Sequence, residues 1–290
     1  MGNSFVYYLI ILPISFLPYR LLHLLSDFTF FVLYRLLRYR RKTVLINIQN
    51  SFPKKSSEEH LLIMEGFFRH FCDLIVESFK GFTISKKEMS KRMKVRNPKV
   101  LSRFYKEKKD VILVGGHYNN WEIFAAGIGL RAKHIPVGIY KPLTNDYFDN
   151  KMRISRERFR LIMCPMNETK EFMEKNFGEP KATIFAIDQS PSNTKNCHWM
   201  TFLNQDTPVF FGAEKYAKKY NSPVVFGTIH KVKRGFYELE YELICESPEE
   251  TKDDEITEMN TKKLEKDINQ KPEFWLWTHR RWKHSRPAIT

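Results

Sequence analysis

A short apolar run that ends in two glycines constrains the fold of this chain more than any other feature. Residues 111–114 are Val-Ile-Leu-Val, a β-branched sequence typical of a buried strand. The glycines at 115–116 end this run with residues that accept unusual backbone angles. Asn119 or Asn120 can then cap a helix whose apolar residues begin at Ile123. The sequence therefore predicts a strand, a turn and a helix in direct succession.

Similar strand and helix patterns alternate along the rest of the chain. We expect further strands at 135–140, 182–187 and 223–229, and helical segments at 120–131, 148–161, 167–177 and 210–220. Residues 237–244 alternate in polarity like an edge strand, and 253–270 form a charged helix. A long amphipathic helix is expected over 57–79. This order predicts an α/β fold: one domain with a mainly parallel sheet flanked by helices.

The N-terminal residues differ from this domain in composition. Residues 5–17 and 21–37 are apolar, but each is short or interrupted by polar side chains, so neither is a clean membrane span. We expect residues 1–42 to form a membrane anchor that inserts shallowly or as a tilted helix, and residues 43–290 to form the catalytic domain. Without a basic start or a small-residue cleavage site, this segment does not resemble a removed signal peptide. The alternative is a pair of core helices packed on the domain.

Positive charge dominates the surface that this chain can present. Its formal net charge is +15, and cations are concentrated at residues 35–42 and 86–109. Such stretches attract anionic lipid head groups or an acidic carrier protein. Nucleic acid is disfavoured as a partner because no zinc-finger spacing, RNA-binding motif or phosphate loop accompanies the charge. For 86–109 a plain solvated helical face remains an equal alternative.

His117 and Glu122 are the candidate catalytic pair. On one regular helix, residues five apart lie about 140° from each other, so the pair requires His117 in the turn and Glu122 in the first helical turn. There Glu122 could accept a proton from one ring nitrogen and leave the other basic. About one His-x4-acid pair is expected by chance among nine histidines and 33 acidic residues, and His60 with Glu65 is such a pair. We interpret that second pair as structural because no strand or glycine turn precedes it.

Four ordered blocks of sequence resemble the lipid A late acyltransferases, the lauroyl and myristoyl transferases of the glycerolipid acyltransferase superfamily. Residues 116–122, Gly-His-Tyr-Asn-Asn-Trp-Glu, resemble the family's Gly-His-x-Gly-Asn-Trp-Glu. The other blocks are Tyr-Lys-Pro-Leu at 140–143 followed by Ser-Arg-Glu-Arg at 155–158, Ala-Ile-Asp-Gln at 186–189, and the Pro-Glu-Phe-Trp-Leu-Trp-Thr-His-Arg-Arg-Trp-Lys sequence at 272–283. Ser190 stands where the family has a second aspartate, which leaves the role of that loop open. Asn119 replaces a glycine, a mild change because Asn also accepts a left-handed turn.

The resemblance implies an acyltransferase domain over 43–290 that moves a fatty acyl chain from acyl carrier protein to a hydroxyl of a lipid A precursor. It implies a location on the cytoplasmic face of the bacterial inner membrane, in lipopolysaccharide biosynthesis. Because a guanidinium can grip a phosphate in two places, we expect substrate contacts from arginines on 153–158. The candidate substrate-binding residues are Arg156, Arg153, Asp188 and Asn120. Arg153 and Arg158 are alternatives to Arg156 as the phosphate contact. A surface salt bridge from Arg156 to Glu157 or Asp149 is an equal alternative to a substrate contact. Arg280 and Arg281 are candidates for binding lipid head groups.

No cofactor and no structural metal are expected. The four cysteines are widely spaced and form no Cys-x-x-Cys pair, which favours free thiols in a reducing compartment. A zinc site built from His117 and distant ligands stays an alternative. Other acyl acceptors, such as a lysophospholipid, a mannosylated lipid or an amino-acid lipid, would use the same residues. A non-catalytic basic membrane-binding protein is the alternative from another class, and a hydrolase is disfavoured because no Gly-x-Ser-x-Gly elbow is present.

Overall fold

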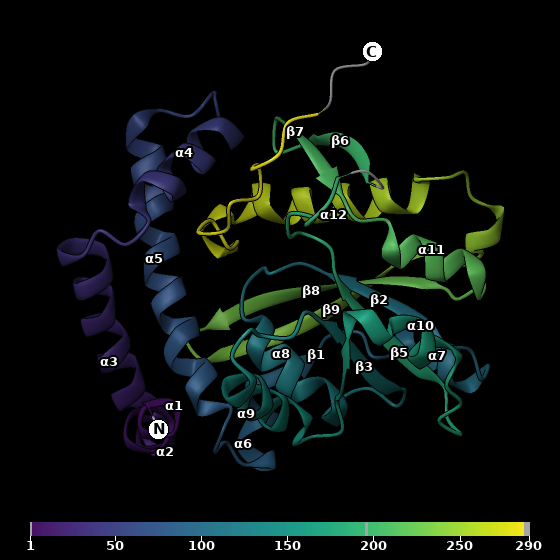
Figure 1. Cartoon of the computed structure of the whole chain (residues 1–290), viewed down its shortest axis with the longest axis horizontal. Helices are drawn as coiled ribbons and strands as arrows, with labels where there is room; N and C mark the ends of the chain where they lie inside the picture. Colours follow the sequence, from purple (N-terminus) through teal and green to yellow (C-terminus); the bar gives the residue numbers. More distant parts are fainter. Residues whose placement is uncertain (1, 195–196, 287–290) are drawn as a thin grey trace.

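The computed structural model describes residues 2–194 and 197–286, which fold around a central sheet (Figure 1). The strands of this sheet are β1 (Met93–Val95), β2 (Val111–Gly115), β3 (Ile135–Tyr140), β4 (Ile162–Pro165), β5 (Lys181–Ala186), β8 (Val224–Lys233) and β9 (Phe236–Cys245). Their order is β1-β9-β8-β2-β5-β3-β4, and every neighbouring pair is parallel except β8 with β9. The predicted mainly parallel sheet is therefore confirmed.

Helices pack on both faces of this sheet and at its carboxyl edge. They are α4 (Arg41–Ser51), α5 (Ser57–Lys80), α6 (Lys86–Arg92), α7 (Lys99–Lys106), α8 (Trp121–Gly127), α9 (Asp146–Glu157), α10 (Thr169–Glu174), α11 (Gly212–Lys219) and α12 (Glu255–Gln270). Alternate side chains of β2 enter two separate cores: Ile112 packs in the cluster that contains Leu264 of α12, and Leu113 packs in the cluster that contains Ile123 of α8. The chain thus forms a single α/β domain in which β2 is buried on both faces.

Three regions differ from the sequence prediction. The predicted edge strand 237–244 is not at the edge of the sheet, because β1 pairs with the start of β9. Strand β1 was not predicted because it has only three residues and lies within the basic stretch, where no apolar run marks it. Stretch 86–109 is accordingly not one helical face but α6, β1 and α7. The hairpin of β6 (His198–Phe202) and β7 (Gln205–Val209) was not predicted, since its turn residues Leu203 and Asn204 adopt positive φ without the usual glycine. The predicted helix 148–161 ends at Glu157, before β4.

Helix α5 crosses the carboxyl edge of the parallel strands. In Figure 1 the arrowhead of β8, which is parallel to β2, points toward α5. The helix begins with a capping box in which Ser56 and Glu59 satisfy each other's backbone N–H groups. His60, from the second His-x4-acid pair, is buried against the carbonyl of Phe52, while Glu65 bonds to Arg69 on the outer face. These contacts are structural, as the sequence predicted.

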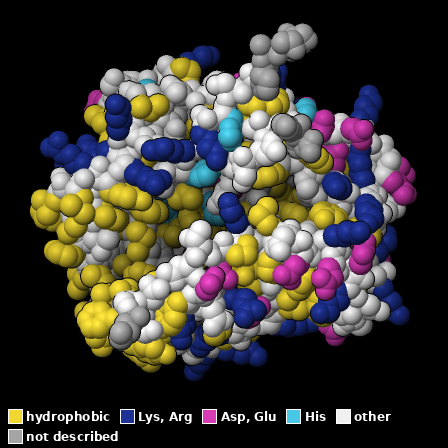
Figure 2. Space-filling model, in the orientation of Figure 1, with side chains coloured by type: hydrophobic (Ala, Val, Ile, Leu, Met, Phe, Trp, Pro, Cys, Tyr) yellow, Lys and Arg dark blue, Asp and Glu magenta, His cyan; other side chains and the backbone are white. Residues whose placement is uncertain are grey.

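The chain before α4 is helical and leaves apolar side chains exposed. It forms α1 (Gly2–Val6), α2 (Leu12–Phe16) and α3 (Tyr19–Phe30), with π-helical turns at Tyr7–Ile11 and Phe31–Leu36. Within residues 2–194 and 197–286, none of the helices has the length and apolar character needed to cross a membrane. Figure 2 shows hydrophobic side chains gathered over the N-terminal helices, with Lys and Arg side chains beside them.

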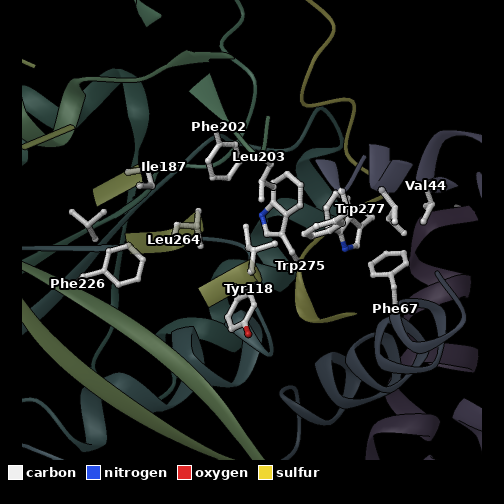
Figure 3. Close-up of a cluster of buried hydrophobic side chains, with 14 of the residues drawn as sticks. Val44, Phe67, Tyr118, Ile187, Phe202, Leu203, Phe226, Leu264, Trp275 and Trp277 are labelled. Atoms are coloured by element: carbon white, nitrogen blue, oxygen red, sulfur yellow. The ribbon is translucent and has the colours of Figure 1, made fainter. Parts of the chain in front are cut away.

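The C-terminal segment supplies the centre of the larger core. Trp275 and Trp277 are almost completely buried, and Figure 3 shows Trp275 between Tyr118, Leu203 and Leu264. Trp275 also pairs with Tyr118 through an isolated antiparallel bridge. This packing fixes the C-terminal segment against the turn after β2.

Candidate active site

The turn after β2 is held close to neighbouring elements, as the glycines in the sequence require. A Cβ on Gly116 would lie 2.8 Å from both terminal carbons of Leu264 and 3.3 Å from a carboxylate oxygen of Asp188. Asn119 adopts a positive φ of 60°, the left-handed conformation that its amide side chain tolerates. Its backbone N–H donates to the carbonyl of Phe274. The strand, turn and helix predicted over 111–130 are confirmed, with His117 in the turn.

Asp188 is the carboxylate that contacts the His117 ring. Its Oδ1 lies 2.7 Å from Nδ1 of His117, and its Oδ2 accepts from the His117 backbone N–H at 2.7 Å and from Nε1 of Trp275 at 2.8 Å. The two residues meet because β2 and β5 are parallel neighbours whose carboxyl ends lie at the same edge of the sheet. With Nδ1 donating to a carboxylate, the neutral ring carries its proton there and Nε2 is free to accept.

Nε2 of His117 lies on the accessible side of the ring. The His117 side chain is 19% exposed, whereas Asp188 is 2% exposed. The side-chain amide of Gln189, an exposed residue, lies 3.2 Å from Nε2, and the ring of Trp121 contacts the imidazole edge to face. Histidine side chains line the central hollow of the surface in Figure 2. A hydroxyl that approaches Nε2 would replace the Gln189 amide there.

Electrostatics favours a basic imidazole. Burial would lower the pKa of His117, but the Asp188 carboxylate and its hydrogen bond outweigh burial and raise this pKa above its ordinary value. Glu122 contributes a smaller upward effect. Burial would raise the pKa of Asp188, but the same pairing lowers it below its usual range. Asp188 is therefore ionised whenever His117 accepts a proton near neutral pH.

Glu122 does not hold the His117 ring, which corrects the pairing expected from the sequence. It lies in the first turn of α8, as predicted, but its two oxygens accept from Nη2 of Arg156 at 2.7 Å and Nε of Arg156 at 3.1 Å. Trp121 donates to the same carboxylate. The pKa of Arg156 is lowered by burial but raised more by Glu122, so the guanidinium stays charged. The partner of Arg156 is thus neither Glu157 nor Asp149.

The other predicted binding residues make contacts within the protein or lie away from the His117 ring. Asn120 is fully buried and caps α8, so it cannot contact a substrate. The two oxygens of Asp188 accept hydrogen bonds from His117 and Trp275. Arg153 is exposed on α9 and donates to Asn150 at 3.4 Å. Arg281 is 1% exposed and cannot reach lipid head groups.

The remaining predicted arginines have other positions. Arg158 donates to the carbonyl of Gly81 on a neighbouring segment. Arg280 is exposed, so it remains free to meet an external group. Of the arginines proposed on 153–158, the structure therefore brings Arg156 alone to the first turn of α8.

The loop that departs from the family pattern is anchored by a second histidine. The backbone N–H of Ser190 donates to Nε2 of His279 at 2.9 Å. Burial lowers the pKa of His279 to about 4, so this ring is neutral and can accept. The hydroxyl of Ser190 itself has no partner among the described residues. A backbone contact at Ser190 thus holds this loop against the C-terminal segment.

Three residues of the site were missed from the sequence: Trp275, Gln189 and Glu77. Trp275 donates to Asp188, and Glu77 accepts from the Asn120 amide at 2.7 Å. A signal for Gln189 existed, since it directly follows a predicted strand and Asp188. No local pattern marks Glu77, which lies inside a long amphipathic helix. Within residues 2–194 and 197–286 no group of three or more His, Cys, Asp or Glu side chains could hold a metal ion.

Comparison with known proteins identifies the family of this chain. Residues 2–284 match the model of the bacterial lipid A biosynthesis acyltransferases. The chain belongs to this family. It is 24% identical over 255 residues to the lipid A biosynthesis palmitoleoyltransferase of Escherichia coli (strain K12), which covers 87% of this chain and 81% of that protein. The lipid A biosynthesis acyltransferase of Shigella flexneri matches with the same identity and coverage.

Membership in the lipid A biosynthesis acyltransferase family confirms the resemblance drawn from the four sequence blocks. All four blocks, and both the turn after β2 and the loop after β5, lie within the matched residues. The protein is therefore an acyltransferase, and its family implies a lipid A precursor as the acceptor class.

Proposed function

We propose that this acyltransferase moves a fatty acyl chain from the thioester of acyl carrier protein to a hydroxyl of a lipid A precursor. The observation that carries the proposal is the His117 ring, which is bonded to Asp188 through Nδ1 and has Nε2 on its accessible side. This arrangement supports a general base that acts on an incoming alcohol. Acceptors other than a lipid A precursor would use the same base.

In this reaction His117 transfers a proton from the acceptor hydroxyl to the departing thiolate. His117 takes the proton of the acceptor hydroxyl on Nε2 as the oxygen attacks the thioester carbonyl. Asp188 stabilises the resulting imidazolium and keeps the ring oriented. When the tetrahedral intermediate collapses, the C–S bond breaks, the ester forms, and the imidazolium returns its proton to the departing thiolate. No metal or cofactor takes part in this path.

Arg156 is the proposed contact for an anionic group of the substrates. Glu122 holds its Nε and Nη2, and no acceptor among the described residues bonds to its Nη1. Both proposed substrates carry phosphate, which a partly engaged guanidinium can still bind. Arg156 also acts on His117 electrostatically, which places its charge near the reacting atoms. Glu122 is thus proposed to act catalytically by orienting Arg156.

Basic stretch 86–109 is the proposed docking surface for acyl carrier protein. Within this stretch Lys86, Lys87, Lys91, Lys94, Lys99, Lys106 and Lys108 are exposed or partly exposed and form no ion pair among the described residues. An acidic partner would be attracted to such a surface.

Residues 1–42 are proposed to anchor the protein on the cytoplasmic face of the bacterial inner membrane. Their exposed apolar side chains include Phe5, Leu9, Phe16, Leu24, Phe28, Phe31, Leu36 and Leu37, each about half exposed or more. Patches of this kind mark membrane or protein contact sites. The cations at 35–42 lie beside this surface and would meet anionic head groups. Replacing Leu24, Phe28 and Phe31 by Ser should abolish cosedimentation with anionic vesicles, and unchanged cosedimentation would refute the anchor.

The reaction is tested with purified protein, labelled acyl carrier protein and a lipid A precursor that has free hydroxyls. We expect mass spectrometry to detect one added acyl chain. Replacing His117 by Ala should lower the rate by about 10² to 10⁴ while the protein stays folded. Glu65→Ala, in the structural His-x4-acid pair, is the matched control and should keep the wild-type rate.

Parallel assays identify the alternatives. Transfer only from acyl-CoA, or only to a lysophospholipid, would replace the proposed donor or acceptor. Absence of transfer from both donors to every acceptor would refute the enzyme assignment and favour a membrane-binding protein. A folded His117→Ala variant with wild-type activity would refute the base.

A further inference from the structure

Glu77 is a buried carboxylate that the proposed reaction does not use. It lies in the last turns of α5, its side chain is 1% exposed, and no Lys or Arg of the described residues forms an ion pair with it. Burying a carboxylate without a fixed cation is costly unless several donors satisfy it. Glu77 is therefore a residue whose contacts need an explanation beyond packing.

Three donors from three separate elements meet this carboxylate. Asn120, the N-cap of α8, donates to Oε2 at 2.7 Å, and the hydroxyl of Tyr237 from β9 donates to the same oxygen at 2.9 Å. Nε2 of His23 from α3 lies 3.1 Å from Oε1. Since α3 belongs to the N-terminal helices, Glu77 connects these helices, the sheet and the turn after β2 through one side chain.

The contact with Asn120 decides how the turn is built. The Asn120 amide has one oxygen and one NH₂ group, and its oxygen caps α8 by accepting from the backbone N–H of Ile123 at 2.9 Å. Glu77 accepts from the NH₂ group of Asn120. If the amide were flipped, its own oxygen would face the carboxylate oxygen of Glu77 and no hydrogen bond could form. Glu77 thus selects the amide orientation that begins the helix.

The orientation of Asn120 matters for both halves of the site. His117 precedes this cap by three residues, and Glu122 follows it by two. Glu77, Glu122 and Arg156 also line one small cavity of about 20 Å³. A shift of the cap would therefore move the base and the Glu122–Arg156 pair together.

We propose that Glu77 is a positioning residue for acyl transfer, which holds the His117 turn and the first turn of α8 in their reactive arrangement through the Asn120 amide. This inference rests on the proposed function. It predicts a loss in kcat together with a rise in KM for phosphorylated substrate, since the base and the Glu122–Arg156 pair shift together. Misplacement by about 1 Å can cost on the order of 10²-fold in rate.

Asp73 offers a matched control on the same helix. It lies one turn before Glu77, is 4% exposed, and likewise ties α5 to α3 through Ser26 and to the β8–β9 hairpin through Lys231 and Arg234. It makes no hydrogen bond to the turn after β2 in the described residues. Removing Asp73 should therefore disturb the same helix packing without moving the cap.

The test compares Glu77→Ala, Glu77→Gln and Asp73→Ala in the full chain, with rates expressed per folded molecule. Glu77→Ala should lower kcat by about 10- to 100-fold and raise KM for phosphorylated substrate. Glu77→Gln should recover most of this loss, because its carbonyl oxygen can still accept from Asn120 and Tyr237. Asp73→Ala should lose thermal stability but keep its kcat. Wild-type kcat in Glu77→Ala, or a Glu77→Gln variant as slow as Glu77→Ala, would overturn the proposal.

Two further measurements cover the remaining outcomes. If Glu77→Ala does not fold, Glu77→Asp replaces it in the test, because it shortens the side chain by one methylene and keeps the charge. Glu77→Asp should lose kcat as expected for Glu77→Ala. A wild-type kcat in Glu77→Asp would overturn the proposal. If the wild-type protein transfers no acyl group, the proposed function fails by itself. Hydrogen exchange at the Ile123 amide then tests the positioning role: it should speed up in the Glu77 variant but not in Asp73→Ala, and equal exchange would refute it.

Discussion

The loop after β5 and the first turn of α8 each bring a carboxylate near His117, but they use it differently. Asp188 receives the ring Nδ1, a backbone N–H and an indole N–H, all within 2.8 Å. Glu122 receives a guanidinium and acts on His117 only through space. The difference teaches that closeness in sequence does not select the partner of a catalytic histidine. The order of strands in the sheet does.

This comparison divides two tasks that a single acid was expected to perform. Asp188 fixes the tautomer and raises the pKa of His117, while Glu122 holds Arg156. Loss of either residue should slow the enzyme, but the pH dependence and KM should change in different ways.

The largest effect is expected from Asp188→Asn. The His117 backbone N–H and Nε1 of Trp275 would hold the oxygen of the new amide, so its NH₂ group would face Nδ1 and favour the wrong tautomer of the ring. We expect kcat to fall on the order of 10² to 10⁴-fold. The base must be neutral to act, so wild-type activity falls as pH decreases through the raised pKa of His117, above 6.5. Removing Asp188 lowers that pKa, and the acidic limb of the pH–rate profile should move to lower pH. If the acidic limb of the pH–rate profile stays at the same pH, the pairing of His117 with Asp188 is contradicted.

Glu122→Gln should have the next largest effect and should act through Arg156. The guanidinium loses its ionic partner, so KM for phosphorylated substrate should rise and kcat should fall by about tenfold or more. Removing Glu122 lowers the pKa of His117 less than removing Asp188, because its contribution is the smaller one. Steady-state kinetics over pH measures both. If the acidic limb moves further in Glu122→Gln than in Asp188→Asn, Glu122 and not Asp188 is the main acid that raises the pKa of His117.

A smaller effect is expected from Trp275→Phe. The ring keeps its place in the core, but Asp188 loses a hydrogen bond from Nε1, which holds the pKa of this carboxyl down. The pKa of Asp188 should rise, and stability should fall by about 1–2 kcal/mol. We expect kcat to decrease only a few-fold, because the His117 contacts remain. Chemical denaturation and kinetics on the same preparation separate the two effects, and a loss as large as that of Asp188→Asn would require another role for Trp275.

Gly116→Ala should affect stability more than chemistry. The added Cβ meets Leu264 at 2.8 Å, and overpacking of this kind costs about 1–3 kcal/mol. Leu264→Ala in the same chain provides space, so the double variant should be more stable than the sum of the two single losses predicts. Strict additivity of the unfolding free energies would exclude this contact as the cause.

Much of this architecture could be predicted from local sequence. The strand at 111–115, the glycine turn and the capped helix follow from residue types whose preferences act over a few positions. The amphipathic pattern of 57–79 likewise predicted α5 almost to the residue. What escaped were elements with weak local signals: β1 with three residues, and the β6–β7 hairpin with Leu203 in an unusual turn conformation.

The site was predictable only in part for a related reason. The sequence identified His117, Glu122, Arg156 and Asp188, but it paired His117 with Glu122 instead of with Asp188. Strands β3 and β4 come between β2 and β5 along the chain, whereas β2 and β5 are neighbours in the sheet. The contact between His117 and Asp188 is therefore set by strand order, which spacing does not encode.

The most direct test of the account is an NMR titration of the His117 ring in the wild type and in the Asp188→Asn and Glu122→Gln variants. We predict a His117 pKa above 6.5 in the wild type, a large decrease in Asp188→Asn and a small one in Glu122→Gln. A pKa that stays unchanged in Asp188→Asn and falls in Glu122→Gln would contradict the account.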